Sequence, residues 1–153
     1  SGSLGVLSLG TDGSVVLGFA GSIQDGPGAD FIVWENAFWV SGNVDNVFQE
    51  LGEVAVSTDG ETWTVFPCDV DRTDGFDTGC AGWRPRLEYD ACSMNPLVPE
   101  LVGGDPYDLS ELGISSVRYI RIRDRGVAGD PIKGVTPSAG FDLDAVGVVH
   151  PGL

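Results

Sequence analysis

Basic residues are scarce in this chain, which has a single lysine (Lys133) and a single histidine (His150). Lys and Arg number 8 against 23 Asp and Glu, so the formal net charge is −15 at pH 7. Such an acidic surface repels phosphate backbones and anionic lipids, which argues against nucleic acid and anionic membranes as partners. The same charge favours cations, although it also serves plain solubility.

Long apolar runs are missing too. No stretch approaches the roughly 18 apolar residues of a membrane span, so membrane insertion is not expected. With one histidine and no Cys-x-x-Cys pair, neither a zinc site nor a histidine-dependent nucleophile is predicted. His150 is expected to cap the chain or face solvent. No two carboxylates stand apart as an acid and a base, so the protein is predicted not to be an enzyme.

Helical periodicity is confined to one short turn at 107–113, and apolar residues elsewhere alternate or form short blocks. This pattern predicts strands, and the clearest pair flanks Asp59-Gly60, a strong hairpin signal. The expected strands cover 14–21, 29–38, 53–57, 62–66, 115–124 and 139–150. With 23 Gly and 9 Pro spread along 153 residues, the chain is predicted to be one all-β domain, 1–153, folded as a β-sandwich or jelly roll.

The three cysteines, Cys68, Cys80 and Cys92, all lie in a polar stretch rich in proline and glycine. We predict that residues 68–106 form a long ordered loop insertion pinned by a disulfide, with Cys68 and Cys80 as the candidate pair. The pairing stays open, and the third thiol is either free or bonded to another chain. A disulfide suits an exported protein, so an extracellular or cell-surface location is expected.

Several motifs resemble one known family. "VAVSTDGETWTVF", "VRYIRIRDRG" and "FDLDAVGVV" resemble the discoidin or galactose-binding-like jelly roll. Together with "DGPGADFIVWENAF" and "GGDPYDL", they are similar to a group of bacterial cell-surface domains of that type. The resemblance implies an extracellular module that binds carbohydrate or another surface ligand, often with a structural calcium ion. The insertion at 68–106 departs from the simplest modules of the family.

The acidic residues supply candidate calcium ligands, since calcium takes six to eight oxygen ligands. They fall in three groups along the chain: Asp25, Asp30, Glu35 and Asn36; then Asp105 and Asp108; then Asp142 and Asp144. In a regular strand Asp142 and Asp144 share one side, with Leu143 and Ala145 on the other. We predict that Asp30 and Glu35 share an ion with them, which would join an early strand to the last.

Arginine is the alternative partner of these carboxylates. If strand 115–124 neighbours the last strand, Arg121 and Arg123 would form cross-strand salt bridges with Asp142 and Asp144. For Glu35 a separate alternative is a position facing solvent at a sheet edge. The acidic stretch 69–77 lacks the glycine position of an EF-hand loop, which leaves a solvated turn or an irregular calcium loop.

Aromatic residues beside arginines are candidate contacts for a sugar ring. Trp34 and Trp63 share strand faces with apolar residues and are expected in the core. The candidate ligand-binding residues are Trp39, Trp83, Arg84, Arg86, Arg121 and Arg123. Trp83 has an alternative role in sealing the disulfide loop.

Three functional hypotheses follow. The first is a non-catalytic, calcium-stabilised binding module for carbohydrate or another surface ligand. The second is a structural subunit of a surface array or filament, in which a basic strand on an acidic body supports self-association. The third, ranked last, is a carboxylate-based glycan-degrading enzyme.

Overall fold

The computed structural model describes residues 5–43, 47–72, 77–85, 97–127 and 140–152. The strands are β1 (Leu7–Ser8), β2 (Ser14–Gln24), β3 (Phe31–Glu35), β4 (Phe38–Trp39), β5 (Val47–Phe48), β6 (Glu50–Ser57), β7 (Thr64–Val65), β8 (Asp105–Tyr107), β9 (Ser116–Val127) and β10 (Asp142–Val148). The helical elements are α1 (Pro99–Val102) and the 3-10 turns η1 (Val40–Gly42) and η2 (Leu109–Leu112). No helix in the described part of the chain has the length and apolar character needed to cross a bilayer.

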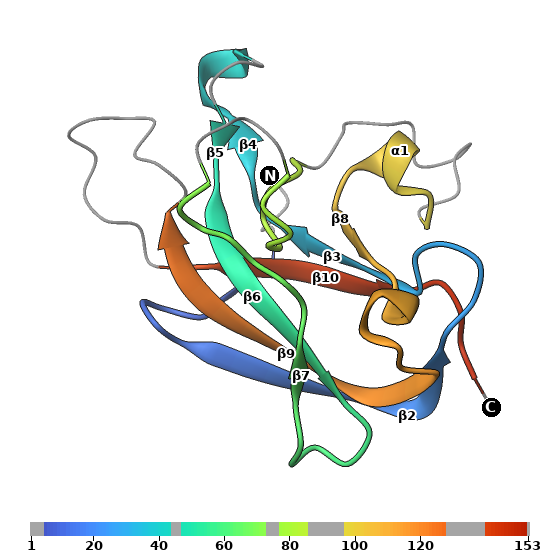
Figure 1. Cartoon of the computed structure of the whole chain (residues 1–153). Coiled ribbons are helices and arrows are strands. Elements are labelled where there is room, and N and C mark those ends of the chain that lie inside the picture. The colour runs from blue at the N-terminus through green and yellow to red at the C-terminus, as the bar shows by residue number, and fades with distance from the viewer. Residues whose placement is uncertain (1–4, 44–46, 73–76, 86–96, 128–139, 153) are drawn as a thin grey trace.

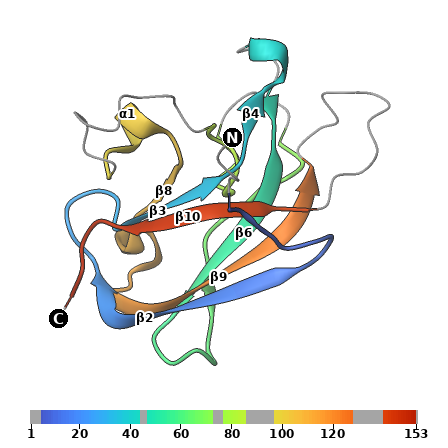
Figure 2. The same cartoon turned by 180° about the vertical axis from the view of Figure 1, so that it is seen from behind.

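Two antiparallel four-stranded sheets pack face to face. One has the order β1-β10-β3-β8 and the other β2-β9-β6-β7, while β4 and β5 form a separate ribbon. Figures 1 and 2 show the two layers from opposite sides. The predicted all-β sandwich is therefore confirmed, and the last strand, β10, pairs with the early strand β3.

Alternation along the strands explains the core. Val54 and Val56 of β6 pair with Ile122 and Ile120 of β9, and all four side chains are fully buried. Phe31 of the opposite sheet joins the same apolar cluster. Burying each such side chain contributes about 1.5–3 kcal/mol, so these positions hold the layers together.

The hairpin at Asp59-Gly60 forms, but its loop is longer than a two-residue turn. Pairing begins only at Ala55–Val65 and Val56–Thr64. Gly60 has a positive φ of 80°, as predicted, whereas the φ of Asp59 is not positive. The Asp59 carboxylate instead accepts the amides of Thr62 and Glu61, and these bonds lower its pKa to about 2.

Trp34 and Trp63 do not lie between the sheets as predicted. Trp63 lies beneath the Arg121 guanidinium, 4.7 Å from the ring centroid, on the outer face where Val65 is 42% exposed. Trp34 points to the outer side of the other sheet, where its Nε1 donates to the Gly103 carbonyl at 3.0 Å. Alternation groups residues by face, but it does not say which face is interior.

Candidate functional site

The disulfide joins Cys68 to Cys80, as predicted. The segment that follows is anchored again where Gly52 and Ala81 exchange two backbone hydrogen bonds of 2.9 Å. Gly79 has φ 74°, and a Cβ there would lie 2.3 Å from the Pro67 carbonyl oxygen, so only glycine allows this close approach. The described parts of the insertion are therefore attached to the sandwich by the disulfide and by these backbone contacts, and its last residues belong to β8.

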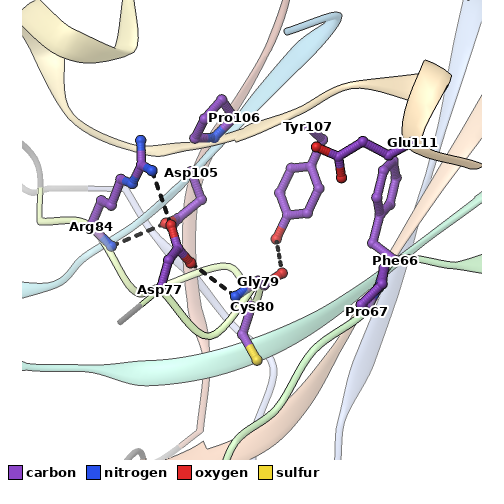
Figure 3. Close-up of a pocket in the computed structure, with 10 residues that line it drawn as sticks. All are labelled: Phe66, Pro67, Asp77, Gly79, Cys80, Arg84, Asp105, Pro106, Tyr107 and Glu111. Atoms are coloured by element: carbon purple, nitrogen blue, oxygen red, sulfur yellow. Dashed lines mark hydrogen bonds and ion pairs between the residues drawn. The ribbon is translucent and has the colours of Figure 1, made fainter. Parts of the chain in front are cut away.

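A pocket of about 320 Å3 lies beside this segment, between the edge strands β7 and β8 (Figure 3). It is lined by Phe66, Pro67, Asp77, Gly79, Cys80, Arg84, Asp105, Pro106, Tyr107 and Glu111. Figure 3 shows Arg84 and the two aspartates at one end, and Phe66, Pro67 and Glu111 at the other. The pocket thus has a polar end and a more apolar end.

Asp105 is the most buried acid of the pocket, at 4% exposure. Its carboxylate accepts the Gly82 amide at 2.7 Å and the Arg84 amide at 3.1 Å. Burial raises its pKa to about 8, against the opposing effect of the Gly82 amide. Asp105 is therefore largely protonated at neutral pH, and it holds the 82–84 segment against β8.

The remaining polar groups of the pocket differ in exposure. Arg84 pairs with Asp77 at 2.9 Å, with the two side chains 45% and 44% exposed, so this ion pair is free to rearrange around a ligand. Tyr107 stacks on Phe31 with 5.2 Å between ring centroids, and its hydroxyl donates to the Gly79 carbonyl at 3.3 Å. Burial raises the Tyr107 pKa well above its usual value, so the phenol stays neutral.

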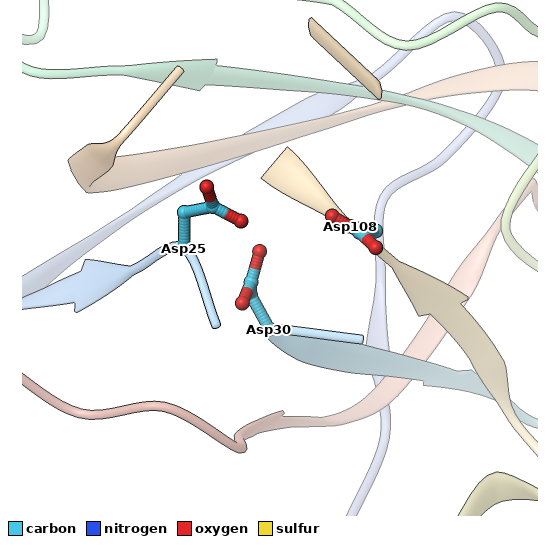
Figure 4. A group of neighbouring side chains, drawn as sticks. All are labelled: Asp25, Asp30 and Asp108. Atoms are coloured by element: carbon cyan, nitrogen blue, oxygen red, sulfur yellow. The ribbon is translucent and has the colours of Figure 1, made fainter. Parts of the chain in front are cut away.

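A second group of carboxylates gathers at the other end of β8 (Figure 4). Oxygens of Asp25, Asp30 and Asp108 lie within 4.8 Å of one another, and the three side chains point together. The residues come from the end of β2, the start of β3 and the end of β8. This part of the predicted metal set is brought together.

Asp30 also serves as a structural clamp. It is fully buried, and its carboxylate accepts the Gly26 amide at 2.8 Å, the Leu109 amide at 2.7 Å and His150 Nδ1 at 2.8 Å. His150, predicted to be a cap or solvent-facing, instead ties the end of the chain to Asp30. Asp108 caps η2 by accepting the Ser110 amide at 2.8 Å.

Glu35 and Asp142 form a third acidic site, at the opposite end of β3. Glu35 is 2% exposed, so it does not face solvent, and it pairs in register with Leu143 beside Asp142. Burial, then the negative charges of Glu50 and Asp142, raise its pKa to about 9. Five residues of strand place Asp30 and Glu35 about 16 Å apart, so one ion cannot bind both.

The predicted geometry of the last strand needs two corrections. A bulge between Leu143 and Ala145 breaks the alternation, so Leu143 is buried while Ala145 is exposed. Strand β9 pairs with β2 and β6, not with β10, so Arg121 and Arg123 lie in the other sheet. The prediction that these arginines form cross-strand salt bridges with Asp142 and Asp144 is therefore wrong.

The other predicted site residues are scattered. Asn36 is exposed, and its amide donates to the Asp142 carbonyl at 3.1 Å. Trp83 is half-buried and does not line the pocket. Asp144 is half-buried at the bulge.

Trp39 is described only as backbone of β4, while Arg86 and Cys92 lie outside the described residues. In the acidic turn, Asp69 accepts the Asp71 amide, but part of 69–77 lies outside them too.

Sequence reasoning missed Asp77, Tyr107 and Glu111 as pocket residues. The signal available was their position in the cysteine-rich insertion (Asp77) or just after it (Tyr107 and Glu111), but only the disulfide and β8 bring them together. Comparison with protein families, with curated proteins and with solved structures finds no match to this chain.

Proposed function

We propose that the protein is a non-catalytic binding module that holds a neutral sugar, or a ligand with similarly spaced hydroxyls, in the pocket between β7 and β8. The observation that carries this proposal is the pocket itself, since about 320 Å3 lies at the lower end of small-molecule sites. A monosaccharide unit suits that size. The motifs that resemble discoidin-like domains support the same ligand class.

The polar groups of the pocket favour hydroxyls over carboxylates. Asp77 and Glu111 are acceptors, while Arg84 is the one basic side chain among the lining residues. A uronic acid would face more negative than positive charge there, whereas sugar hydroxyls donate to carboxylates and accept from guanidinium. Phe66 and the ring of Tyr107 give the apolar wall that a sugar ring packs against.

Calcium is proposed as a stabilising ion at Asp25, Asp30 and Asp108. Three carboxylates this close repel one another unless a cation lies between them. Asp108 directly follows Tyr107, so an ion here would steady the strand that forms one wall of the pocket. An extracellular or cell-surface location is proposed with it, because the disulfide suits an oxidising compartment.

Binding of sugars tests the pocket directly. A neutral hexose glycoside is expected to bind in isothermal titration calorimetry. Arg84→Ala is expected to lower the affinity for this glycoside about tenfold, because it removes a charged hydrogen bond. Because the Arg84 pair with Asp77 is exposed, this change should leave the fold intact.

Arg118→Ala is the matched control, since Arg118 is exposed and its guanidinium donates to the Phe19 carbonyl, away from the pocket. Equal effects of the two variants, or no binding by any neutral, amino or uronic sugar, would rule out the pocket as a sugar site. If the protein hydrolyses a glycan and Asp105→Asn abolishes that activity, the protein is an enzyme and not a non-catalytic binding module.

A second candidate function is assembly, favoured by the outer face of the β2-β9-β6-β7 sheet. Val16 and Val65 are 51% and 42% exposed there, and Arg121 stands between them in register. An arginine and valine surface on an acidic chain fits an acidic surface of a second copy.

If assembly is the function, light scattering after size exclusion should show a mass that rises with concentration at low salt. Added salt should reverse the rise, because charge attraction is screened. A monomer at every concentration and salt level contradicts assembly through this face.

A further inference from the structure

The buried acids of this protein differ in what they bind. Asp30 and Asp105 each accept two backbone amides, as described above. Asp124, 2% exposed, accepts the amides of Asp12 and Phe141, each at 2.9 Å. Glu50, 3% exposed, accepts the Gly140 amide at 3.0 Å. Each of these four carboxylates therefore has a structural task in fixing a loop.

Glu35 is the exception among the described buried acids. Glu35 is 2% exposed, yet its Oε2 has no hydrogen-bond partner. Asp142 Oδ1 is likewise buried and without a partner. Two unsatisfied carboxylate oxygens at one place are costly, since buried polar atoms in folded proteins are nearly always paired.

The surroundings of Glu35 indicate what is missing. The charged groups that act on it most strongly are all acidic, first Glu50, then Asp142 and Asp105. The arginines of β9 lie in the other sheet, and none is positioned to pair with Asp142. Among the described residues no basic side chain satisfies these two oxygens, so either a bound cation or a shared proton must do so.

We propose that Glu35 and Asp142, with Glu50 as a third carboxylate, bind a hard divalent cation of the calcium class. Hard cations take carboxylate oxygens and water as ligands, and Asp142 is exposed enough to admit water. The site is separate from Asp25, Asp30 and Asp108, because β3 lies between them. The ion would join β3 and β10 of one sheet to the start of β6 in the other.

A shared proton is the alternative, since a protonated Glu35 that donates to Asp142 would satisfy both oxygens without an ion. The two explanations differ in what a glutamine does. Glu35→Gln keeps the shape and supplies an N–H donor toward Asp142, but it removes one metal-binding charge. It should therefore abolish a cation site and leave a proton-bonded pair almost unchanged.

The test is calcium titration by calorimetry on chain first stripped with EDTA, paired with thermal unfolding. The wild type should bind calcium and gain Tm. Glu35→Gln should bind about one calcium fewer per chain and lose the matching part of the Tm gain. Asp142→Asn should do the same, and Glu53→Gln, at a partly exposed acid paired with Arg125, is the matched control.

Asp25→Asn separates this site from the calcium proposed at the end of β2. If Asp25→Asn removes a calcium that Glu35→Gln leaves in place, and the reverse also holds, both sites bind. If Asp25→Asn changes nothing while Glu35→Gln removes the calcium, only the site at Glu35 and Asp142 binds an ion. An unchanged calcium stoichiometry and Tm gain in Glu35→Gln and Asp142→Asn overturns it.

Terbium luminescence provides a second measurement that leaves every acidic residue of the proposed site unchanged. Terbium replaces calcium at oxygen sites, and its emission is sensitised by a nearby tryptophan. Trp34 directly precedes Glu35. The site is supported if Trp34→Phe abolishes the sensitised terbium emission and if excess calcium also abolishes it by displacing terbium. Emission that Trp34→Phe leaves unchanged counts against the site.

Discussion

Replacing Asp30 with alanine is expected to lower the free energy of unfolding by about 4 kcal/mol, measured by urea denaturation in EDTA. The substitution leaves the amides of Gly26 and Leu109 buried without an acceptor and frees His150. EDTA keeps calcium out of the comparison, so the loss reports the hydrogen bonds alone. Such a loss is a large part of the stability of a typical domain.

Two further variants make this prediction specific. Asp25→Ala, an exposed neighbour, should change the unfolding free energy in EDTA by less than about 0.5 kcal/mol. Asp30→Asn should fall between, since its amide keeps one oxygen acceptor. Similar losses for Asp30→Ala and Asp25→Ala would mean that the buried clamp contributes little.

Stability is expected to fall as the pH rises from about 4 to about 8, again in EDTA. Burial raises the pKa of Asp105 to about 8 in the folded protein, from an ordinary aspartate value of 3.8. Across that window the folded state binds more protons than the unfolded state, so raising the pH destabilises it. At about 1.4 kcal/mol per pKa unit, Asp105 alone contributes on the order of 5 kcal/mol to the fall.

The quantity to measure is the slope of the unfolding free energy against pH, rather than its absolute value. Asp105→Asn should flatten it, leaving a residual slope from Glu35, whose pKa is also raised. Asp59→Asn is the matched control, because Asp59 titrates below the window with a pKa of about 2. A wild-type profile that is level or rises between pH 5 and pH 8 contradicts the prediction.

Much of the sandwich follows from local pattern. The alternation of Ile120 and Ile122 predicts which side of β9 is apolar, and the Asp59-Gly60 turn predicts where β6 reverses. The bulge at Asp144 was not predictable, because nothing in "FDLDAV" distinguishes a regular strand from one with an extra residue. Trp63 was placed on the wrong side, since its partner Arg121 is distant in sequence and makes the outer face favourable.

The candidate sites were predicted in part. The sequence indicates that acidic residues of the second strand and of the last strand come near each other, and Glu35 and Asp142 do so. It cannot indicate that Asp30 is separated from them by the length of β3. The contact between Asp30 and His150 spans 120 residues, so it depends on the whole topology rather than on spacing.

The strand lengths bear on how this protein avoids joining its sheets to those of other chains. The two four-stranded sheets, as far as the structure describes them, have four edge strands, and three of these are very short: β1 and β7 have two residues each and β8 has three. Strand β8 also contains Pro106, which cannot donate a ladder hydrogen bond. The remaining edge, β2, has 11 residues. Its end is covered by the last residues of the chain, because Gln24 N–H donates to the His150 carbonyl and Gly152 N–H to the Ser22 carbonyl, so its open backbone lies in the part before Ser22. Gly18 and Gly21 within it weaken strand pairing, so resistance to aggregation depends mainly on β2.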